Sequence, residues 1–244
     1  MSDIAAALRG DLGAAITGHA KGVFISFEGG EGSGKSTQSK MLKEYLETQG
    51  HTVVLTREPG GTALGKELRD ILLHTHDHVS PRAEALLYAA DRAHHVDTLI
   101  RPALERGEIV ITDRYLDSSI AYQGAGRVLS PGEVGRISRW ATESLIPTLT
   151  IIIDLPSEIG LGRLKSKDRL ESEPSAFHER VRQEFLSLAL LDPERYLVVD
   201  GRHSIELIHS TIVSRVAELR DLNKIEKKPK TKKIKKPTLR KRAK

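Results

Sequence analysis

A glycine-rich segment near the N-terminus carries the strongest chemical signal in the chain. Residues 29–36 read GGEGSGKS, which satisfies the pattern G-x-x-x-x-G-K-[ST]. Glycines let the backbone approach a phosphate group closely, and successive N–H groups can surround its oxygens. The lysine of this pattern places its ammonium group between the β- and γ-phosphates, and the hydroxyl after it binds Mg²⁺. The segment therefore predicts a site for a nucleoside triphosphate, and we assign ATP-binding roles to Gly29, Gly30, Glu31, Gly32, Ser33, Gly34, Lys35, Ser36 and Thr37.

The segments on either side of this motif provide its setting. An apolar, β-branched run at residues 23–28 predicts a buried strand before the loop, and the apolar spacing in residues 35–49 predicts an amphipathic helix after it. The strand pattern returns at residues 52–56, 109–112, 149–153 and 196–199, with helical stretches between. Parallel strands need crossover connections, so the alternation predicts an α/β fold with a mainly parallel, five-stranded sheet covered on both faces.

Length and composition limit the class of protein. The 244 residues can form one α/β domain, which we place at residues 22–222. There is no cysteine, which excludes a disulfide framework and fits a reducing compartment. The apolar runs are far shorter than the ~20 residues that cross a bilayer, and none resembles a signal peptide. We expect a soluble, cytoplasmic protein with no membrane contact, in which residues 1–21 form a poorly ordered N-terminal extension.

The positive charge is concentrated at the C-terminus. The chain has a formal net charge of +5, but residues 223–244 hold 12 Lys or Arg and one acid, Glu226, so this basic tail carries +11 and the remainder −6. A segment with so few apolar residues cannot offset the entropy lost on ordering, and we expect it to be disordered. A flexible basic arm can still make weak, non-specific contact with RNA or other polyanions.

A triphosphate site alone does not separate kinases from switches and motors. A GTPase would need an N-K-x-D guanine-binding motif, whereas the only Asn-Lys pair, Asn223-Lys224, is followed by Ile225 and Glu226. Motor ATPases usually need a larger core than this chain can supply. A small phosphotransferase fits best.

Four further segments follow the glycine-rich motif. They read TREPGGT at residues 56–62, AEALLYAADR at 83–92, DRYLDSSIAYQGAGR at 113–127 and DRLE at 168–171. In this order and spacing they resemble the thymidylate kinase family, whose members phosphorylate dTMP to dTDP for dTTP synthesis. The resemblance runs from about residue 22 to residue 219. It implies a three-layer P-loop NTPase fold with a short lid, ATP and dTMP as substrates, Mg²⁺, and a homodimer.

Transfer between two phosphates requires cations, because the acceptor phosphate and the γ-phosphate of ATP repel each other. Arg57, Arg69 and Arg114 are the candidates, since a planar guanidinium can bind two phosphate oxygens at once. The resemblance implies that Arg69 and Arg114 contact the acceptor phosphate, while Arg57 and Glu58 organise the loop beside it. Asp113, at the end of a predicted strand, is placed to support Mg²⁺ with Ser36 or to orient Arg114.

The resemblance also implies a pocket for the base. Tyr88 would stack on thymine and Arg92 would bond its edge; the two lie four residues apart and so on one face of a predicted helix. Tyr122 would pack against the sugar and disfavour a ribose 2′-hydroxyl. The remaining substrate-binding candidates are Ser118, Ser119 and Gln123.

Glu31 is an anion inside the phosphate loop, and the resemblance places it near the 3′-hydroxyl of the acceptor or its metal-water network. Family members without an arginine in this loop draw cations from a mobile lid, which we place at about residues 160–175. Its catalytic candidates are Arg163, Lys165 and Lys167, with Arg169 nearby.

Two other functions stay open on the sequence. The nearer is a kinase for another nucleoside monophosphate or for a deoxynucleoside. The more distant is a nucleic-acid-binding protein that acts through its basic tail.

Overall fold

The computed structural model describes residues 21–75, 77–127 and 129–219. The expectations for the N-terminal extension and the basic tail therefore fall almost wholly outside the described residues. Within these ranges, no helix is long and apolar enough to cross a membrane.

Five parallel strands form one sheet with the order β2-β3-β1-β4-β5. They are β1 (Val23–Glu28), β2 (Val53–Arg57), β3 (Ile109–Asp113), β4 (Leu149–Asp154) and β5 (Tyr196–Asp200). Each expected strand is present, with its ends within one residue of the expected ones. The expected parallel α/β fold is confirmed.

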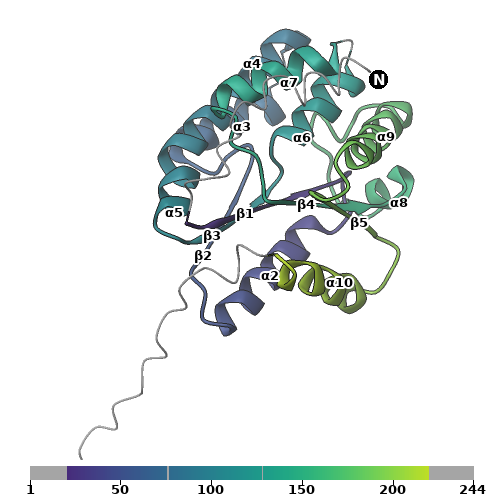
Figure 1. The fold of residues 1–244 in the computed structure, drawn as a ribbon. Helices are drawn as coiled ribbons and strands as arrows, with labels where there is room; N and C mark the ends of the chain where they lie inside the picture. The colour runs from purple at the N-terminus through teal and green to yellow at the C-terminus, as the bar shows by residue number, and fades with distance from the viewer. Residues whose placement is uncertain (1–20, 76, 128, 220–244) are drawn as a thin grey trace, which may run out of the picture.

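Helices cover both faces of the sheet (Figure 1). One face carries α2 (Lys35–Thr48) and α10 (Ile205–Ala217). The other face carries α3 (Ala63–His74), α4 (Pro81–His95), α5 (Arg101–Glu105), α6 (Leu116–Ser119), α7 (Pro131–Ala141) and α9 (Ser175–Leu191). Two π-helical segments, η1 (Val96–Ile100) and η2 (Ile120–Gly126), continue α4 and α6, and the short α8 (Ser157–Gly162) packs against α9.

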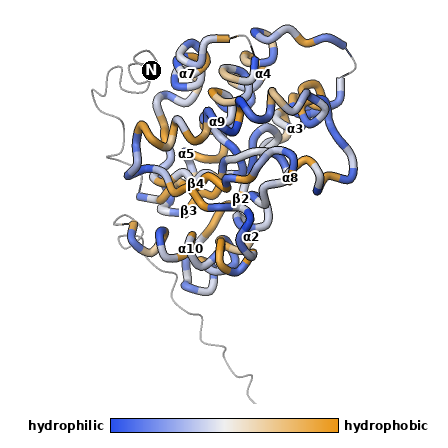
Figure 2. Tube along the Cα trace, turned by 90° about the vertical axis from the view of Figure 1, so that its right-hand side faces the viewer, coloured by the Kyte–Doolittle hydropathy of each residue, from blue (hydrophilic) through white to orange (hydrophobic). Residues whose placement is uncertain are grey.

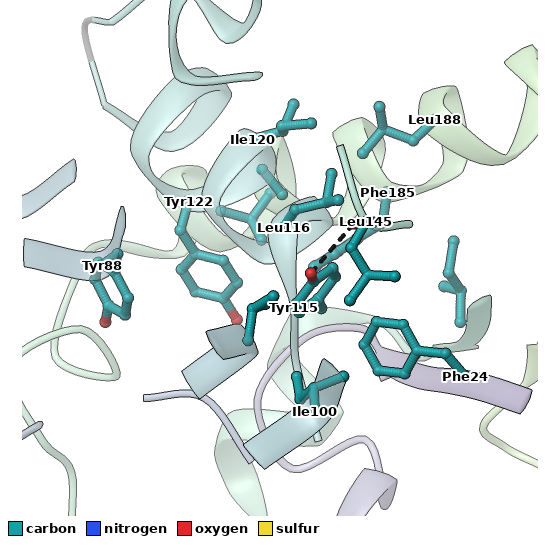
Figure 3. Packing of buried hydrophobic residues seen from close by; sticks show 14 of the residues in the cluster. Phe24, Tyr88, Ile100, Tyr115, Leu116, Ile120, Tyr122, Leu145, Phe185 and Leu188 are labelled. Atoms are coloured by element: carbon teal, nitrogen blue, oxygen red, sulfur yellow. Dashed lines mark hydrogen bonds between the residues drawn. The ribbon is translucent and has the colours of Figure 1, made fainter. Parts of the chain in front are cut away.

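The central strands β1, β3 and β4 are apolar along most of their length because both of their faces are buried, whereas Leu55 on β2 and Val198 on β5 are exposed (Figure 2). Side chains that alternate along β1 supply the two cores: Phe24 joins the core under α4 and α9, whereas Ile25 and Phe27 join the core under α2 and α10. Figure 3 shows the first core, in which the Tyr115 hydroxyl donates a hydrogen bond of 3.2 Å to the Leu145 carbonyl. Packing on both faces holds the strand ends, and the loops that leave them, in fixed positions.

Candidate active site

The glycine-rich loop leaves β1 and enters α2 directly, as the sequence predicts. Gly29, Gly32 and Gly34 adopt positive φ angles, which residues with a Cβ rarely do. Lys35 folds back over the loop and donates to the carbonyls of Gly29 at 3.1 Å and Gly30 at 2.7 Å. Burial, followed by repulsion from Arg114, lowers the pKa of Lys35, while Glu31 and other nearby acids counteract this shift. The ammonium group of Lys35 therefore lies against the backbone of the loop.

Ser36 and Asp113 meet beside this loop. The Ser36 hydroxyl donates to Asp113 Oδ2 at 2.5 Å, and the pair lines an open cavity of about 740 Å³. Register brings Arg57 to the same edge, because it pairs with Asp113 across β2 and β3. Carboxylate and hydroxyl oxygens are ligands that Mg²⁺ prefers, and the cavity leaves space for water on the metal, so the pair fits the expected ion.

Arg114 follows Asp113 and turns to the opposite side of the loop. Its Nη1 donates to Gly29 O and Ser118 Oγ, both at 3.1 Å, and its Nη2 donates to Glu31 Oε1 at 2.6 Å. The Tyr122 hydroxyl also donates to Glu31 Oε1, at 2.7 Å. A cation, an anion and a phenol from three segments therefore form one cluster.

The charge state of this cluster is well defined. Burial alone would raise the pKa of Glu31, but attraction to Arg114 and Lys35 and the bond from Tyr122 outweigh it and lower the pKa to about 2. Burial alone would lower the pKa of Arg114, but attraction to Glu31 outweighs this effect, and the pKa is raised. Glu31 and Arg114 are therefore both charged at neutral pH.

A second cavity, of about 540 Å³, opens next to the cluster. It is lined by Glu31, Glu58, Pro59, Arg69, Leu73, Tyr88, Arg92, Arg114, Ser118, Ser119, Tyr122, Gln123, Asp168, Leu170 and Glu171. All nine expected substrate-binding residues are among them. Tyr88 and Tyr122, both labelled in Figure 3, belong to the core cluster and also line this cavity.

Arg92 lies in the wall of this second cavity, with only 1% of its surface exposed. Its Nε donates to Glu58 Oε2 at 2.7 Å, Nη1 to Ser119 and Ser138, and Nη2 to the Tyr115 carbonyl. Four of its five N–H groups thus bond to protein. Glu58 also contacts His95 Nδ1 at 2.9 Å, so it holds both residues.

A third group of charges joins the segment expected to be the lid, residues 160–175, to the wall of the second cavity. Glu84 of α4 accepts from Gln123 at 3.0 Å, from Arg127 at 3.2 Å and from Arg169 at 2.5 Å. Burial of Glu84 opposes its ionisation, but these donors outweigh it and lower its pKa. Arg169 additionally donates to the Leu72 carbonyl, which fixes the end of the lid against α3.

The lid begins in contact with the phosphate loop. A Cβ on Gly32 would lie 2.1 Å from the Gly160 carbonyl oxygen, so the two backbones touch there. Arg163 Nη1 donates to the Gly32 carbonyl at 3.0 Å, whereas Lys165 and Lys167 are exposed. Asp168 and Glu171 form a reciprocal cap: Asp168 Oδ1 accepts from the Glu171 N–H, and Glu171 Oε2 accepts from the Asp168 N–H.

This geometry, with a glycine-rich loop beside a separate cavity lined by charged and aromatic residues, agrees with a comparison against known protein families. Residues 27–212 match the model of the family described as thymidylate kinase. The chain belongs to the thymidylate kinase family.

The chain also matches individual thymidylate kinases over most of their length. The chain is 59% identical to thymidylate kinase from Clavibacter sepedonicus over 198 residues, which is 80% of this chain and 94% of the relative. It is 55% identical to thymidylate kinase from Bifidobacterium longum strain DJO10A over 203 residues, 81% of this chain and 98% of the relative. The crystal structure of thymidylate kinase from Ehrlichia chaffeensis superposes with a TM-score of 0.66 at 33% identity, covering 80% of this chain and 98% of that one.

The sequence motifs of the thymidylate kinase family fall into two groups in space. Ser36 at the end of the glycine-rich loop, Arg57 and Asp113 line the first cavity, and the expected substrate-binding residues line the second. Glu31 of the loop and Arg114, which bond each other, also line the second cavity. Of the lid cations, Arg163 contacts the phosphate loop.

Sequence reasoning missed three buried acidic or basic residues of this thymidylate kinase site. Glu84 and His95 lie in the AEALLYAADR segment or just after it, and Glu28 ends the first predicted strand. Each has side-chain partners from distant segments. Glu28 and Glu84 could have been found from the sequence, because each is a charged residue at a position where the apolar pattern predicts a buried side chain.

Proposed function

We propose that this protein transfers the γ-phosphoryl group of ATP to dTMP and forms dTDP for dTTP synthesis. The observation that carries the proposal is the Arg114–Glu31 pair, which joins the triphosphate loop to the second cavity. Membership of the thymidylate kinase family supports the choice of reaction and substrate.

In this reaction a phosphate oxygen of dTMP attacks the γ-phosphorus in line. The new P–O bond forms as the bond to the β–γ bridging oxygen breaks, and ADP leaves. Lys35 neutralises charge on the donor, and Arg114 and Arg69 hold the acceptor phosphate from the second cavity. Positioning and neutralisation carry such transfers, so no covalent enzyme intermediate is needed.

We assign the metal site to Ser36 and Asp113. A bound Mg²⁺ would neutralise charge on the donor phosphates. Arg57, exposed at the same edge of the sheet, would organise the loop between the two cavities. Arg163 is the lid cation best placed to reach the donor, because it already contacts the phosphate loop. Lys165 and Lys167 would approach when the lid closes and excludes water.

The acceptor base is assigned to the wall formed by α4 and η2. Tyr88 offers an aromatic face for stacking on thymine, and the guanidinium of Arg92 can bond an oxygen on the base edge. Tyr122 closes the sugar side, with Ser118, Ser119 and Gln123 beside it. Glu31 is held charged within reach of the acceptor's 3′-hydroxyl.

A panel of acceptors tests this assignment. Purified protein is mixed with Mg-ATP and with dTMP, dUMP, dCMP, dGMP or thymidine, and ADP formation is measured for each. We expect the highest kcat/KM for dTMP. A higher kcat/KM for another monophosphate, or for thymidine, would show that this compound is the acceptor in place of dTMP.

We also propose a homodimer in the cytoplasm. Large apolar side chains are exposed on three adjacent helices: Ile71 on α3, Leu86 on α4 and Trp140, with 84% of its surface exposed, on α7. Pairing this face with a second copy would bury them. Sedimentation velocity of the Trp140→Asp variant tests the idea: we expect a shift from dimer to monomer, and a monomeric wild-type protein would contradict it.

A further inference from the structure

Glu28 is a fully buried acid that the reaction described above does not use. It is the last residue of β1, directly before the phosphate loop, and its exposed fraction is 0%. A carboxyl group in such a place needs bonding partners, because its transfer from water is otherwise costly. The identity of these partners indicates what the residue does.

Both partners of Glu28 come from the segment that carries Arg114. Oε1 accepts from the backbone N–H of Tyr115 at 2.8 Å, and Oε2 accepts from the hydroxyl of Ser118 at 2.6 Å. The carboxyl therefore contacts the residue immediately after Arg114 and a side chain one helical turn further on.

The backbone of Arg114 needs such support. Its φ of 72° lies in the left-handed region, which is disfavoured for a residue with a Cβ. Its own N–H donates to the Phe27 carbonyl at 2.9 Å, and its carbonyl accepts from the Thr112 hydroxyl at 2.9 Å. The bond from Tyr115 N–H to Glu28 fixes the next peptide unit, so both sides of Arg114 are tied to neighbouring strands.

The side chain of Arg114 depends on the same acid. Ser118 Oγ donates to Glu28 and accepts from Arg114 Nη1 at 3.1 Å. Glu28 thus holds Ser118 where it can receive the guanidinium and direct Nη2 towards the second cavity.

We propose that Glu28 is a positioning residue that holds Arg114 in its left-handed backbone conformation and, through Ser118, aims its guanidinium at the acceptor phosphate. The proposal rests on the proposed function, in which Arg114 binds that phosphate. It attributes to Glu28 a much larger effect on binding of the phosphate group than on binding of the nucleoside.

The protonation of Glu28 suggests a matched control. Burial, followed by repulsion from Asp117, raises the pKa of Glu28 to about 8, although Ser118, Arg114 and the Tyr115 N–H counteract the shift. Lys35 and Tyr196 are the other titratable groups near it. A protonated carboxyl and an amide have a similar shape, and each offers one accepting oxygen and one donor. In Glu28→Gln the amide oxygen can still accept from the Tyr115 N–H, and the amide nitrogen can donate to Ser118 Oγ, so both contacts are kept with the Ser118 bond reversed. Glu28→Leu has a similar volume but no polar atom.

The test compares binding of dTMP and thymidine by calorimetry. We expect Glu28→Leu to weaken dTMP binding about tenfold or more, which corresponds to roughly one lost charge-assisted bond, and to leave thymidine binding within about twofold. Glu28→Gln should bind both ligands as the wild-type protein does. An equal loss for both ligands in Glu28→Leu would show a general structural role and overturn the proposal.

A double-mutant cycle examines the path through Arg114. In an Arg114→Ala background, Glu28→Leu should cause no further loss of dTMP affinity, because the group that it positions is gone. A full additive loss would contradict the proposal. If Glu28→Leu does not fold, Glu28→Asp replaces it: its carboxyl is withdrawn by one methylene, so the ratio of dTMP to thymidine affinity should fall, and an unchanged ratio would also contradict the proposal.

The wild-type protein separates this idea from the proposed function. If it binds dTMP no more tightly than thymidine, the role of Arg114 in phosphate binding, and the positioning role with it, is wrong. If it prefers another monophosphate, only the substrate is wrong, and the same comparison is made with that monophosphate and its nucleoside.

Discussion

Individual side chains in the site are held by protein partners that compete with the ligands. Lys35 bonds two carbonyls of its own loop, and Arg114 bonds Glu31. Lys35 and Arg114 also repel each other, which contributes to the lowered pKa of the lysine after burial. Phosphate groups would relieve this repulsion, so binding of anions and alignment of the cations are coupled.

At this scale the first prediction concerns Lys35. Lys35→Ala should lower kcat for dTMP phosphorylation about 10²–10³-fold or more, because it removes a fixed cation from the transferred group. Activity is measured as ADP formation. Lys43→Ala is the matched control on the same helix, and thermal unfolding verifies that both variants fold. A folded Lys35→Ala enzyme with full activity would refute the phosphate-loop assignment.

The second prediction concerns the buried pair of Arg92 and Glu58. Sequence reasoning alone suggests that Arg92→Ala simply raises the KM for dTMP, but the residue also neutralises a buried carboxylate. We expect Arg92→Ala to reduce the free energy of unfolding by about 3–5 kcal/mol, since it leaves Glu58 charged and buried with one partner fewer. The double variant with Glu58→Ala should lose less than the sum of the two single changes. The free energies of unfolding of the single and double variants are measured by urea denaturation. Strictly additive losses would show that Arg92 and Glu58 do not stabilise each other.

At the scale of elements, the lid is attached at both ends. Arg163 bonds the phosphate loop near its beginning, and Arg169 bonds Glu84 on α4 near its end. Lys165 and Lys167, between these two contacts, are exposed, and in the proposed reaction they would approach ATP. Glu84 therefore links lid position to the base pocket, where it also holds Gln123.

A third prediction follows for Glu84. Glu84→Gln removes the charge that attracts Arg127 and Arg169, so the lid should spend more time away from the pocket. We expect kcat for dTMP to fall several-fold and ATP hydrolysis without an acceptor to rise. ADP release is measured with and without dTMP, and Glu67→Gln on an exposed face of α3 is the control. Unchanged hydrolysis in Glu84→Gln would mean that the lid does not depend on this contact.

The elements themselves were largely predictable, because five short apolar runs alternate with helical patterns and the runs of β1, β3 and β4 are buried on both faces. The motif residues were predictable as a set for a different reason: their spacing matches one family. Their division between two cavities could not be predicted, because Arg57 and Glu58 are neighbours in sequence but line different cavities. The partners of Glu28 and Arg92 also depend on register between distant segments, which residue types do not encode locally.

For the whole molecule, the distribution of charge leads to the fourth prediction. Residues 223–244 carry +11 and lie outside the described residues. Truncation after Leu222 should leave kcat/KM nearly unchanged at physiological salt, because every residue assigned to the reaction precedes residue 172. At low salt a small loss is expected, since a basic arm attracts anionic substrates and screening reduces this attraction beyond about 8 Å at physiological salt.

Activity of the full-length and truncated proteins at both ionic strengths tests this prediction, with thermal stability as the control. A large loss that persists at physiological salt would show that the tail is part of the folded enzyme. Weak polyanion binding by the tail is measured separately, as RNA affinity against salt concentration, and should disappear on truncation.

The strand order has a consequence for how the chain is made. The central strand, β1, is synthesised first, yet it pairs with β3 and β4, so Val23 meets Ile109 and Ile25 meets Leu149. The β1–β3 ladder therefore cannot form until Asp113 has been synthesised, and the β1–β4 ladder not until β4 follows; long-range pairing of this kind slows folding. The apolar segment at residues 23–28 is consequently the part of the nascent chain most in need of protection from other exposed strands. The phosphate loop that follows it gains its Asp113 partner only when β3 has left the ribosome.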